Sequence, residues 1–528
     1  MSKSPFMRQL NSAANVAGEA SERNVTVEQV IEERIQKSAS RREILQKTVK
    51  ASTARVIPSA KENMAKAPIA PRVVVVGAGL AGLSAAYRLK QAGIHAQVYE
   101  ASSRVGGRCW TGRNDFNEGQ SYEHGGELIN SSHTALLNLI GELNLQMDDL
   151  WAYEEGDFRI VLDGSICPFD MLAKAFMEIR PQLLKDRREA GDITLYNQYT
   201  PRGYELDHMS IVDWINTYVP GGMSSKFGKA VALAYTASVG LESTEVSALL
   251  MVYAMSTATE NDFSPFGSDG DERYRVQGGN DLIPQSLADH LDGQITMSSP
   301  LEALVQNGNG TYTLHFSGRR RGVQADYVIL ALPVSTLRDV DLSRSGFRDL
   351  KLEAIAEMGV STNSKLAMQF TNRHWMSHSS SGSFVSNGGY QNTWDATRAQ
   401  AGESGILVNF TGGSIGHQFG TGSEHDHAAR FLQLMEHDLP GLTDKWNGKA
   451  VLDYWPGQRW AKGSYSCYKL GQYTKYRGVF GEPEGNCFFA GEHTSLQYQQ
   501  FFNGAVETGE RAAKEVLSKL EQRHARMT

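Results

Sequence analysis

Three glycines near residue 80 have the spacing that lets a backbone approach a phosphate group. Gly77, Gly79 and Gly82 satisfy the pattern G-x-G-x-x-G within VVVVGAGLAGLSAA. In such a turn the first glycine permits a tight bend, the second lets a pyrophosphate approach, and the third lets a helix pack closely on a strand. The N-terminus of that helix then faces the negative charge. The spacing predicts a nucleotide-binding turn, and a close-packed structural turn is the alternative.

The residues around these glycines predict the elements that must position them. Four consecutive valines, residues 73–76, are typical of a strand buried on both faces. LSAAYRLKQAG has the composition of a helix, and HAQVYE that of a second strand ending at Glu100. Glu100 follows the third glycine by 18 residues, which is the separation expected of a carboxylate that accepts hydrogen bonds from ribose hydroxyls. This context favours a dinucleotide site.

Two arginines and two further glycines bear on the kind of dinucleotide. Arg104 and Arg108 lie on either side of Gly106–Gly107 in SSRVGGR. The cations suit phosphate, and the glycines let a flat ring approach the backbone. We find no second G-x-G-x-x-G unit for a nicotinamide nucleotide, so a nicotinamide-dependent dehydrogenase is less well supported.

The run from VVVVGAGLAGLSAA through VYEASSRVGGR resembles the flavin-containing amine oxidases, a family that includes monoamine, polyamine and L-amino acid oxidases. The resemblance covers nearly all of the chain after residue 70. YEHGGELI, YRVQGGNDLIPQSLADHL, STNSKLAMQF and FFAGEHTSLQYQQFFNGAVETGERAA match family segments in the same order. It implies an α/β fold, in which a Rossmann-like FAD-binding domain of the glutathione reductase/p-hydroxybenzoate hydroxylase type is interleaved with an α+β substrate-binding domain.

The expected organisation is discontinuous. Residues 1–70 are charged and predict a helical N-terminal extension, whereas DYVILALP and CFFAGEHTS predict buried strands and GAVETGERAAKEVLSKL predicts a helix. HSSSGSFVSNGGYQ predicts a loop or an irregular hairpin. The expected FAD-binding domain comprises residues 71–150, 272–338 and 456–520, and the substrate-binding domain residues 151–271 and 339–455.

The resemblance also implies catalytic and substrate-binding residues. Lys365, in the apolar run KLAMQF, matches a lysine that holds a water beside flavin N5 and assists substrate oxidation and reoxidation by oxygen. A surface lysine is the alternative, but an apolar context is unusual for a solvated cation. Tyr465 and Phe501 match the aromatic pair in front of the flavin; core packing, or Phe502 as the relevant ring, is the alternative for Phe501. Trp375 and Trp460 are further candidates for the substrate cavity.

Other residues are implied as cofactor contacts. Gly125 and Gly126 match a segment that passes close to the isoalloxazine ring, and Val305 matches a valine that grips the adenine side through its backbone. Glu127 follows this segment and is a candidate partner for a cationic amine or for backbone near the flavin. The expected cofactor-binding set is Gly77, Gly79, Leu80, Ala81, Gly82, Glu100, Arg104, Gly106, Gly107, Arg108, Gly125, Gly126, Glu127, Val305, Gly491, Glu492 and Phe501.

Departures from the membrane-bound monoamine oxidases refine the expectation. Ser464 stands where those enzymes carry the cysteine that bonds to FAD, with Cys467 three residues later, so non-covalent FAD is expected. The chain stops in LEQRHARMT without their membrane anchor, which favours the L-amino acid oxidase branch. However, familiar L-amino acid oxidases have a carboxylate-binding arginine soon after the Gly-Gly segment, where this chain has GGELIN.

The leading hypothesis is therefore an FAD-dependent L-amino acid oxidase that uses O2 and releases a 2-oxo acid, ammonia and hydrogen peroxide. A soluble monoamine or polyamine oxidase is the alternative, favoured by the missing arginine. A flavoprotein whose FAD is only structural and whose surface recruits a partner is a third possibility, which the retention of Lys365 and the aromatic residues disfavours.

Composition narrows the partners. A formal net charge of -7 gives no reason to expect nucleic acid, and there is no apolar run long enough for a membrane helix. The four cysteines are widely separated, and His425 and His427 do not share a helix face, so no metal site is expected. Arg41–Arg42 is an incomplete twin-arginine-like pair that leaves localisation open. Dimers are frequent in the resembling family, which makes a homodimer one expected assembly.

Overall fold

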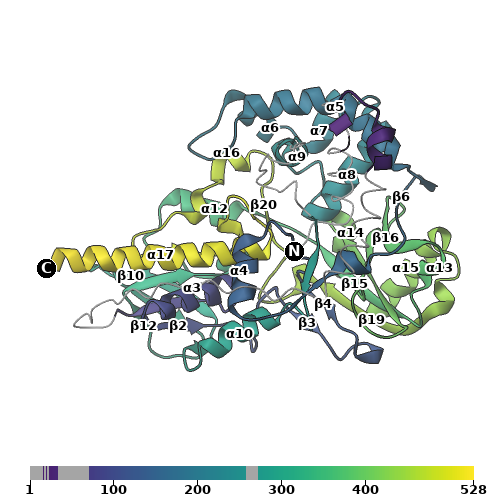
Figure 1. The fold of residues 1–528 in the computed structure, drawn as a ribbon. Helices are drawn as coiled ribbons and strands as arrows, with labels where there is room; N and C mark the ends of the chain where they lie inside the picture. The colour runs from purple at the N-terminus through teal and green to yellow at the C-terminus, as the bar shows by residue number, and fades with distance from the viewer. Residues whose placement is uncertain (1–15, 17–18, 21–22, 34–70, 257–270, 528) are drawn as a thin grey trace.

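The computed structural model describes residues 16, 19–20, 23–33, 71–256 and 271–527 (Figure 1). Most of the expected N-terminal extension, including the arginine pair at 41–42, lies outside the described residues. The described part contains a helical stretch at 27–33, which begins with reciprocal hydrogen bonds between Thr26 and Gln29. Val27 and Val30 of this stretch are buried in the largest hydrophobic cluster, so these residues pack on the body of the protein.

A parallel five-stranded sheet carries the predicted strand–helix–strand unit. β1 (Val73–Val76) leads into α3 (Leu80–Gln91), and β2 (Ala96–Tyr99) lies parallel to β1. The strand order β21–β13–β1–β2–β9 places β1 in the middle. The remaining strands are β13 (Tyr327–Leu330), β21 (Cys487–Phe489) and β9 (Ile295–Thr296). Both predicted strands are confirmed: the strand in DYVILALP (β13) pairs with β1, and the strand in CFFAGEHTS (β21) pairs with β13.

The two faces of β1 pack against different layers. Val73 and Val75 share a cluster with residues of α3 and of α17 (Phe502–Met527), the long C-terminal helix that packs along α3 (Figure 1). Val74 and Val76 share another cluster with residues of a three-stranded antiparallel sheet. That sheet consists of β10 (Leu301–Gln306), β11 (Tyr312–Phe316) and β12 (Val323–Ala325). Burial on both faces explains the unbroken apolar run in β1.

A mixed seven-stranded sheet forms the other large β element, in the order β19–β15–β18–β17–β16–β6–β7. The polar run HSSSGSFVSNGGYQ contributes β16 and the start of β17, which pair antiparallel, so the hairpin alternative is correct and the loop is not. The strands are β6 (Asp157–Leu162), β7 (Ser165–Ile166), β15 (Ser364–Phe370), β16 (Ser380–Ser386), β17 (Gln391–Asp395), β18 (Gly405–Thr411) and β19 (Trp446–Tyr454).

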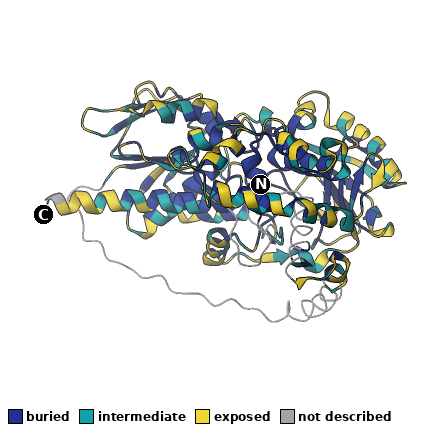
Figure 2. Cartoon of the chain, turned by 90° about the horizontal axis from the view of Figure 1, so that it is seen from above, coloured by how far each residue is buried: buried dark blue, intermediate teal, exposed yellow. Residues whose placement is uncertain are grey.

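A group of helices lies at the top of the view in Figure 1. It includes α5 (Phe169–Ala190), α6 (Pro201–Asp207), α7 (Ile211–Tyr218), α8 (Lys226–Val239) and α9 (Ala248–Met255). α9 is buried along its whole length, and Figure 2 shows buried segments at the centre of the molecule with exposed residues outside. The fold class is α/β, as expected, with a parallel sheet and a separate mixed sheet.

Two further features concern the described residues. None of their helices combines the length and the apolar composition that crossing a bilayer requires. Their four cysteines, Cys109, Cys167, Cys467 and Cys487, are buried free thiols.

Candidate active site and cofactor pocket

The glycine-rich turn joins β1 to α3, and its three glycines have different structural roles. Gly77 has a φ of +103°, and an added Cβ there would lie 2.7 Å from the carbonyl oxygen of Ala331. A Cβ on Gly82 would lie 1.9 Å from the carbonyl oxygen of Gly77. By contrast, the protein atom nearest to a Cβ on Gly79 is 4.0 Å away. The first and third glycines are therefore required by the protein's own packing, whereas the second leaves open space at the N-terminus of α3, as phosphate binding requires.

Glu100 lies directly beyond β2, at the same edge of the sheet as the glycine turn. Its carboxylate accepts hydrogen bonds from the backbone N–H of Ala78 at 2.7 Å and of Ser102 at 2.9 Å. These two bonds fix the carboxylate while leaving lone pairs for a ligand. Glu100 also lines the pocket described below, so its position suits a ribose.

The RVGGR segment closes the turn from the other side. Gly106 N–H donates to the carbonyl of Ala78. Gly107 has a φ of +57°, and the atom nearest to an added Cβ there would be the Cα of Gly79, at 3.6 Å. Arg108 Nη1 lies 3.0 Å from Glu492 Oε1. Burial alone would raise the pKa of Glu492, but the charge of Arg108 and the hydrogen bonds from Arg108 and Ser466 act with His493 to lower it. This pair joins the segment to the loop after β21.

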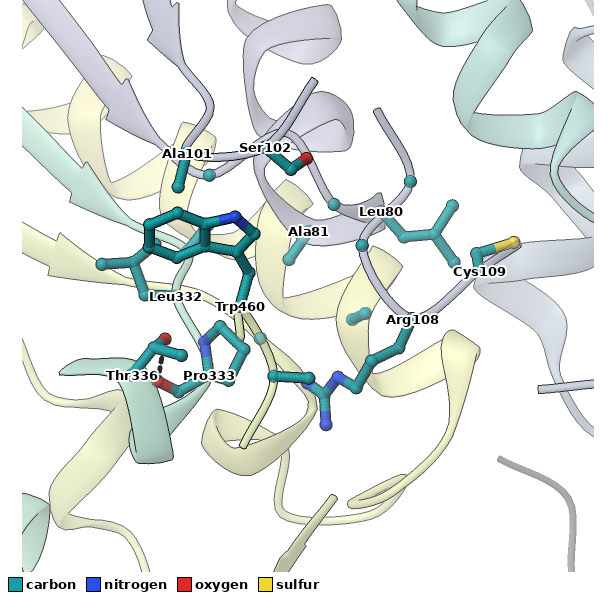
Figure 3. Close-up of a pocket in the computed structure, with 18 of the residues that line it drawn as sticks. Leu80, Ala81, Ala101, Ser102, Arg108, Cys109, Leu332, Pro333, Thr336 and Trp460 are labelled. Carbon is teal, nitrogen blue, oxygen red and sulfur yellow. Dashed lines mark hydrogen bonds between the residues drawn. The ribbon is translucent and has the colours of Figure 1, made fainter. Parts of the chain in front are cut away.

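These parts surround one cavity of about 310 Å³. Figure 3 shows Leu80 and Ala81 at the start of α3, Arg108 on one side, and the indole of Trp460 beside Ala101 and Leu332. A dinucleotide fits this lining, because Gly79 and Gly107 leave open space beside the N-terminus of α3. Arg104 and Arg108 add positive charge. The expected residues that line the cavity are Gly77, Gly79, Leu80, Ala81, Glu100, Arg104, Gly106, Gly107, Arg108, Trp460, Tyr465, Gly491, Glu492, Phe501 and Phe502.

Several expected residues lie elsewhere. Val305 lies near the end of β10, paired with Thr313, and does not line the cavity; Leu301, at the start of the same strand, does. Trp375 is buried in a cluster on the seven-stranded sheet, and its indole N–H donates to Asp395 at 3.2 Å. The structure therefore does not bring Trp375 to the cavity, because its strand neighbours enclose it.

Trp460 lines the cavity beside Ala101, the residue that follows Glu100. A second, open groove shares Ala101, Ser102 and Trp460 with the cavity. The guanidinium carbon of Arg459 lies 4.5 Å from the centroid of the Trp460 ring. The position suits contact with the nucleotide better than contact with a substrate.

Lys365 is buried at the inner side of the Gly125–Gly126 segment. Its Nζ donates to the carbonyl oxygens of Glu123 and Gly125, and it lies 3.0 Å from Glu127 Oε2. An ammonium group has three N–H donors, and here each has an acceptor. Lys365 is only 3% exposed, which excludes the surface-lysine alternative.

Glu127 completes this buried ion pair. Burial alone would raise the pKa of Glu127, but the cationic Lys365 and Arg275 outweigh burial and lower it. Glu127 is 2% exposed and does not line the cavity, so this structure gives it Lys365 as a partner.

The Gly125–Gly126 segment separates this pair from the cavity. A Cβ on Gly125 would lie 1.9 Å from the Arg108 carbonyl oxygen, and one on Gly126 would lie 2.4 Å from the ring of Phe502. Since Arg108 and Phe502 both line the cavity, the segment is packed directly behind its wall. Five further expected residues do not line the cavity themselves: Gly82, Gly125, Gly126, Glu127 and Lys365.

Aromatic rings border one part of the cavity. Tyr465 is buried and its hydroxyl donates to the carbonyl of Ser238. Phe501 is buried beside His133, with ring centroids 5.1 Å apart. Phe502 also lines the cavity, so the structure places both phenylalanines there.

The neighbouring loop contains the serine and cysteine that bear on covalent attachment. Ser464 lines the cavity, and its hydroxyl donates to Asn363 Oδ1 at 2.8 Å. Cys467 is buried in the largest hydrophobic cluster and does not line the cavity. Burial raises the pKa of its thiol, which keeps it protonated.

Two lining tryptophans were missed in the sequence. Trp110 and Trp455 both line the cavity, and both contact His124. The available signals were weak: Trp110 follows RVGGRC directly, and His124 precedes Gly125. No spacing rule connects these residues to Trp455, more than 300 positions later in the chain.

Most of the chain resembles known proteins. A family model described as flavin containing amine oxidoreductase matches residues 80–517. An L-amino acid dehydrogenase of Synechocystis sp. is 24% identical over 472 residues, covering 85% of this chain and 95% of that protein. An L-amino-acid oxidase of Mus musculus is 26% identical over 471 residues, covering 84% and 70%.

A solved structure has the same fold. Cyclohexylamine oxidase from Brevibacterium oxydans superposes with a TM-score of 0.75 at 21% sequence identity, covering 86% of this chain and all of that one. This likeness shows the shared fold. The family match over residues 80–517 assigns the protein as a flavin-dependent oxidoreductase acting on CH–NH2 bonds. The chain belongs to the flavin-containing amine oxidoreductase family.

Proposed function

We propose that the protein is an L-amino acid oxidase that binds FAD without a covalent bond. The observation that carries the proposal is the buried cation of Lys365, held by Glu127 beside the Gly125–Gly126 segment that packs against the cavity wall. When bound, FAD supplies a two-electron acceptor. The names of the L-amino acid dehydrogenase and L-amino-acid oxidase relatives support amino acids as the substrates.

The residues present fit FAD. Glu100 and the glycine turn suit the adenosine ribose and the pyrophosphate, and Tyr465 and Phe501 border the same cavity. Ser464 has no thiol to form a thioether, while the Cys467 side chain is buried away from the cavity. These positions support non-covalent binding.

In the proposed reaction the substrate loses two electrons and two protons overall, and its CH–NH2 becomes an imine. Water hydrolyses the imine to a 2-oxo acid and ammonia, and O2 receives the two electrons and two protons to become hydrogen peroxide. Tyr465 and Phe501 orient the amine-bearing carbon and exclude water. Lys365 favours negative charge on the cavity side of the glycine segment.

The geometry of Lys365 bears on the water expected from the family resemblance. All three donors of the ammonium already have acceptors, of which the Gly125 carbonyl, at 3.3 Å, is the most distant. A water bound to Lys365 would replace this longest bond, which would keep the ion pair with Glu127.

A soluble monoamine or polyamine oxidase is the second candidate, and one observation favours it. A substrate carboxylate needs a cationic partner, yet Arg108 is paired with Glu492. Arg275 is buried and donates to the carbonyl oxygens of Ala396 and Arg398. Two arginines near the glycine segment are therefore already engaged by the protein.

The decisive experiment mixes the purified flavoprotein anaerobically with L-amino acids and with their decarboxylated amines while flavin absorbance is recorded. Bleaching by the amino acids supports the proposal. Bleaching by the amines alone assigns the second candidate, and bleaching by neither contradicts both. Acid precipitation adds a check on attachment, because non-covalent FAD is released into the supernatant. The domain boundaries and the homodimer stay predictions. Cleavage sites in limited proteolysis test the domain boundaries, and analytical ultracentrifugation tests the homodimer.

A further inference from the structure

A column of four side chains connects the seven-stranded sheet with the wall of the cavity. The guanidinium carbon of Arg104 lies 4.4 Å from the centroid of Trp110. On the next level, the rings of Trp110 and His124 stack with centroids 3.6 Å apart and an angle of 20° between their planes. The column ends where His124 Nδ1 lies 2.7 Å from Asp453 Oδ1.

Local pairing fixes the middle of this column. β3 (Thr111–Gly112) and β4 (Tyr122–Glu123) are antiparallel, and His124 N–H donates to the Trp110 carbonyl just beyond them at 2.9 Å. The two residues are therefore cross-strand neighbours, which explains why their rings meet.

Asp453 anchors the inner end. It lies on β19 opposite Lys365 of β15 and is 3% exposed. Burial raises the pKa of Asp453, although the hydrogen bond and charge of His124 act in the opposite direction. The hydrogen bond between His124 Nδ1 and Asp453 Oδ1 limits rotation of the ring. The Tyr122 hydroxyl, 2.8 Å from His124 Nδ1, restricts the ring further.

His124 also contacts the second tryptophan that the sequence did not reveal. Its carbonyl oxygen accepts a hydrogen bond from Trp455 Nε1 at 3.2 Å. One buried residue thus contacts two tryptophans of the cavity wall through different groups, Trp110 through its ring and Trp455 through its backbone.

We propose that His124 is a positioning residue for the cofactor pocket: fixed by Asp453, it holds Trp110 in the orientation that places Arg104 at the nucleotide. This inference rests on the proposed function, because it takes FAD as the ligand of the cavity. Arg104 Nη2 donates to the Gly107 carbonyl at 2.7 Å, so the column ends in the RVGGR segment that borders the nucleotide space.

The test measures the rate at which FAD leaves the holoenzyme, and the recovery of flavin fluorescence monitors this release. H124N removes the stacking ring while keeping a donor for Asp453, and W110L removes its partner. We expect each to speed FAD release about tenfold, and the double variant to release it no faster than the faster single variant. W110F keeps an aromatic face and is expected to stay within about threefold of the wild type. H290A is the matched control, because His290 packs edge-on against Tyr87 and does not line the cavity.

The outcomes are distinct. Unchanged FAD release in H124N, or multiplied effects in the double variant, overturns the inference, since His124 would then not act through Trp110. If H124N does not fold, D453N provides the test: faster FAD release supports the role of the anchor, and an unchanged rate overturns it. A wild-type protein that binds no FAD instead contradicts the proposed function.

Discussion

Lys365 Nζ and Glu127 Oε2 lie 3.0 Å apart, with both side chains almost fully buried. Removing either partner alone would leave a charge in the interior without its counterion, and such losses are far costlier than replacing both by neutral groups. The pair therefore ties the stability of the protein to the charge that the proposed chemistry uses.

We predict that Lys365→Met retains FAD but slows flavin reduction or reoxidation about 100-fold. FAD is retained because Lys365 does not line the cavity. Stopped-flow absorbance with substrate and then with oxygen measures the two steps. Normal rates in both would remove the lysine from the mechanism.

The same substitution is predicted to destabilise the protein by about 3–5 kcal/mol, since it leaves Glu127 unpaired. Lys365→Met/Glu127→Gln is expected to recover most of this loss while remaining slow. Thermal unfolding of the holoproteins gives the order of stability. A double variant less stable than Lys365→Met would show that the buried charge is not the cause.

The glycine turn predicts opposite results for two identical substitutions. Gly79→Ala is expected to fold normally, because its Cβ meets no protein atom closer than 4.0 Å and its φ is −78°. The same variant is expected to bind FAD at least about tenfold more weakly, because the added methyl group occupies the side on which the phosphate binds. Gly82→Ala is expected to lower the thermal midpoint, because its Cβ would clash with the Gly77 carbonyl. FAD titration and thermal unfolding separate the two. Equal behaviour of the variants would contradict the division of roles.

The aromatic border predicts a change in substrate affinity. Phe501→Ala is expected to raise KM about tenfold while FAD remains bound, because a ring at the cavity surface is lost. Trp375→Phe is the control: its side chain lies in the cluster on the seven-stranded sheet, so KM should stay unchanged. Steady-state peroxide assays at saturating FAD measure both. A KM effect at Trp375 and none at Phe501 would reverse the assignment.

Glu123 predicts a pH dependence of stability. Burial raises its pKa from 4.5 to about 8, against the opposing hydrogen bonds from Asn280 N–H and the Thr111 hydroxyl. Between these two values the folded state keeps a proton that the unfolded state releases, so stability falls as pH rises, by at most about 1.4 kcal/mol per unit. Glu123→Gln abolishes this contribution.

The measurement is the difference in thermal midpoint between Glu123→Gln and wild type from pH 5 to 8. The variant should gain relative to wild type as pH rises across this window. A difference that does not vary with pH would show that Glu123 is ionised in the folded protein.

The local sequence determined the nucleotide-binding part of the fold because its requirements are local. Four valines specify a strand buried on both faces, and Gly77 and Gly82 are required by contacts within the turn and its neighbouring strand end. The position of Glu100 follows from the length of one helix and one strand. These relations are short in the chain and carry a fixed geometry.

Tertiary structure alone decided which distant residues meet. Trp375 was expected in the substrate cavity but is buried in the cluster on the seven-stranded sheet. Val305 was expected to contact the cofactor, but Leu301, the first residue of the same strand, lines the cavity instead. The contact of His124 with Asp453 depends on β19, which follows more than 300 residues later in the chain. Side-chain type and spacing do not encode such contacts, because they arise only when separate sheets pack together.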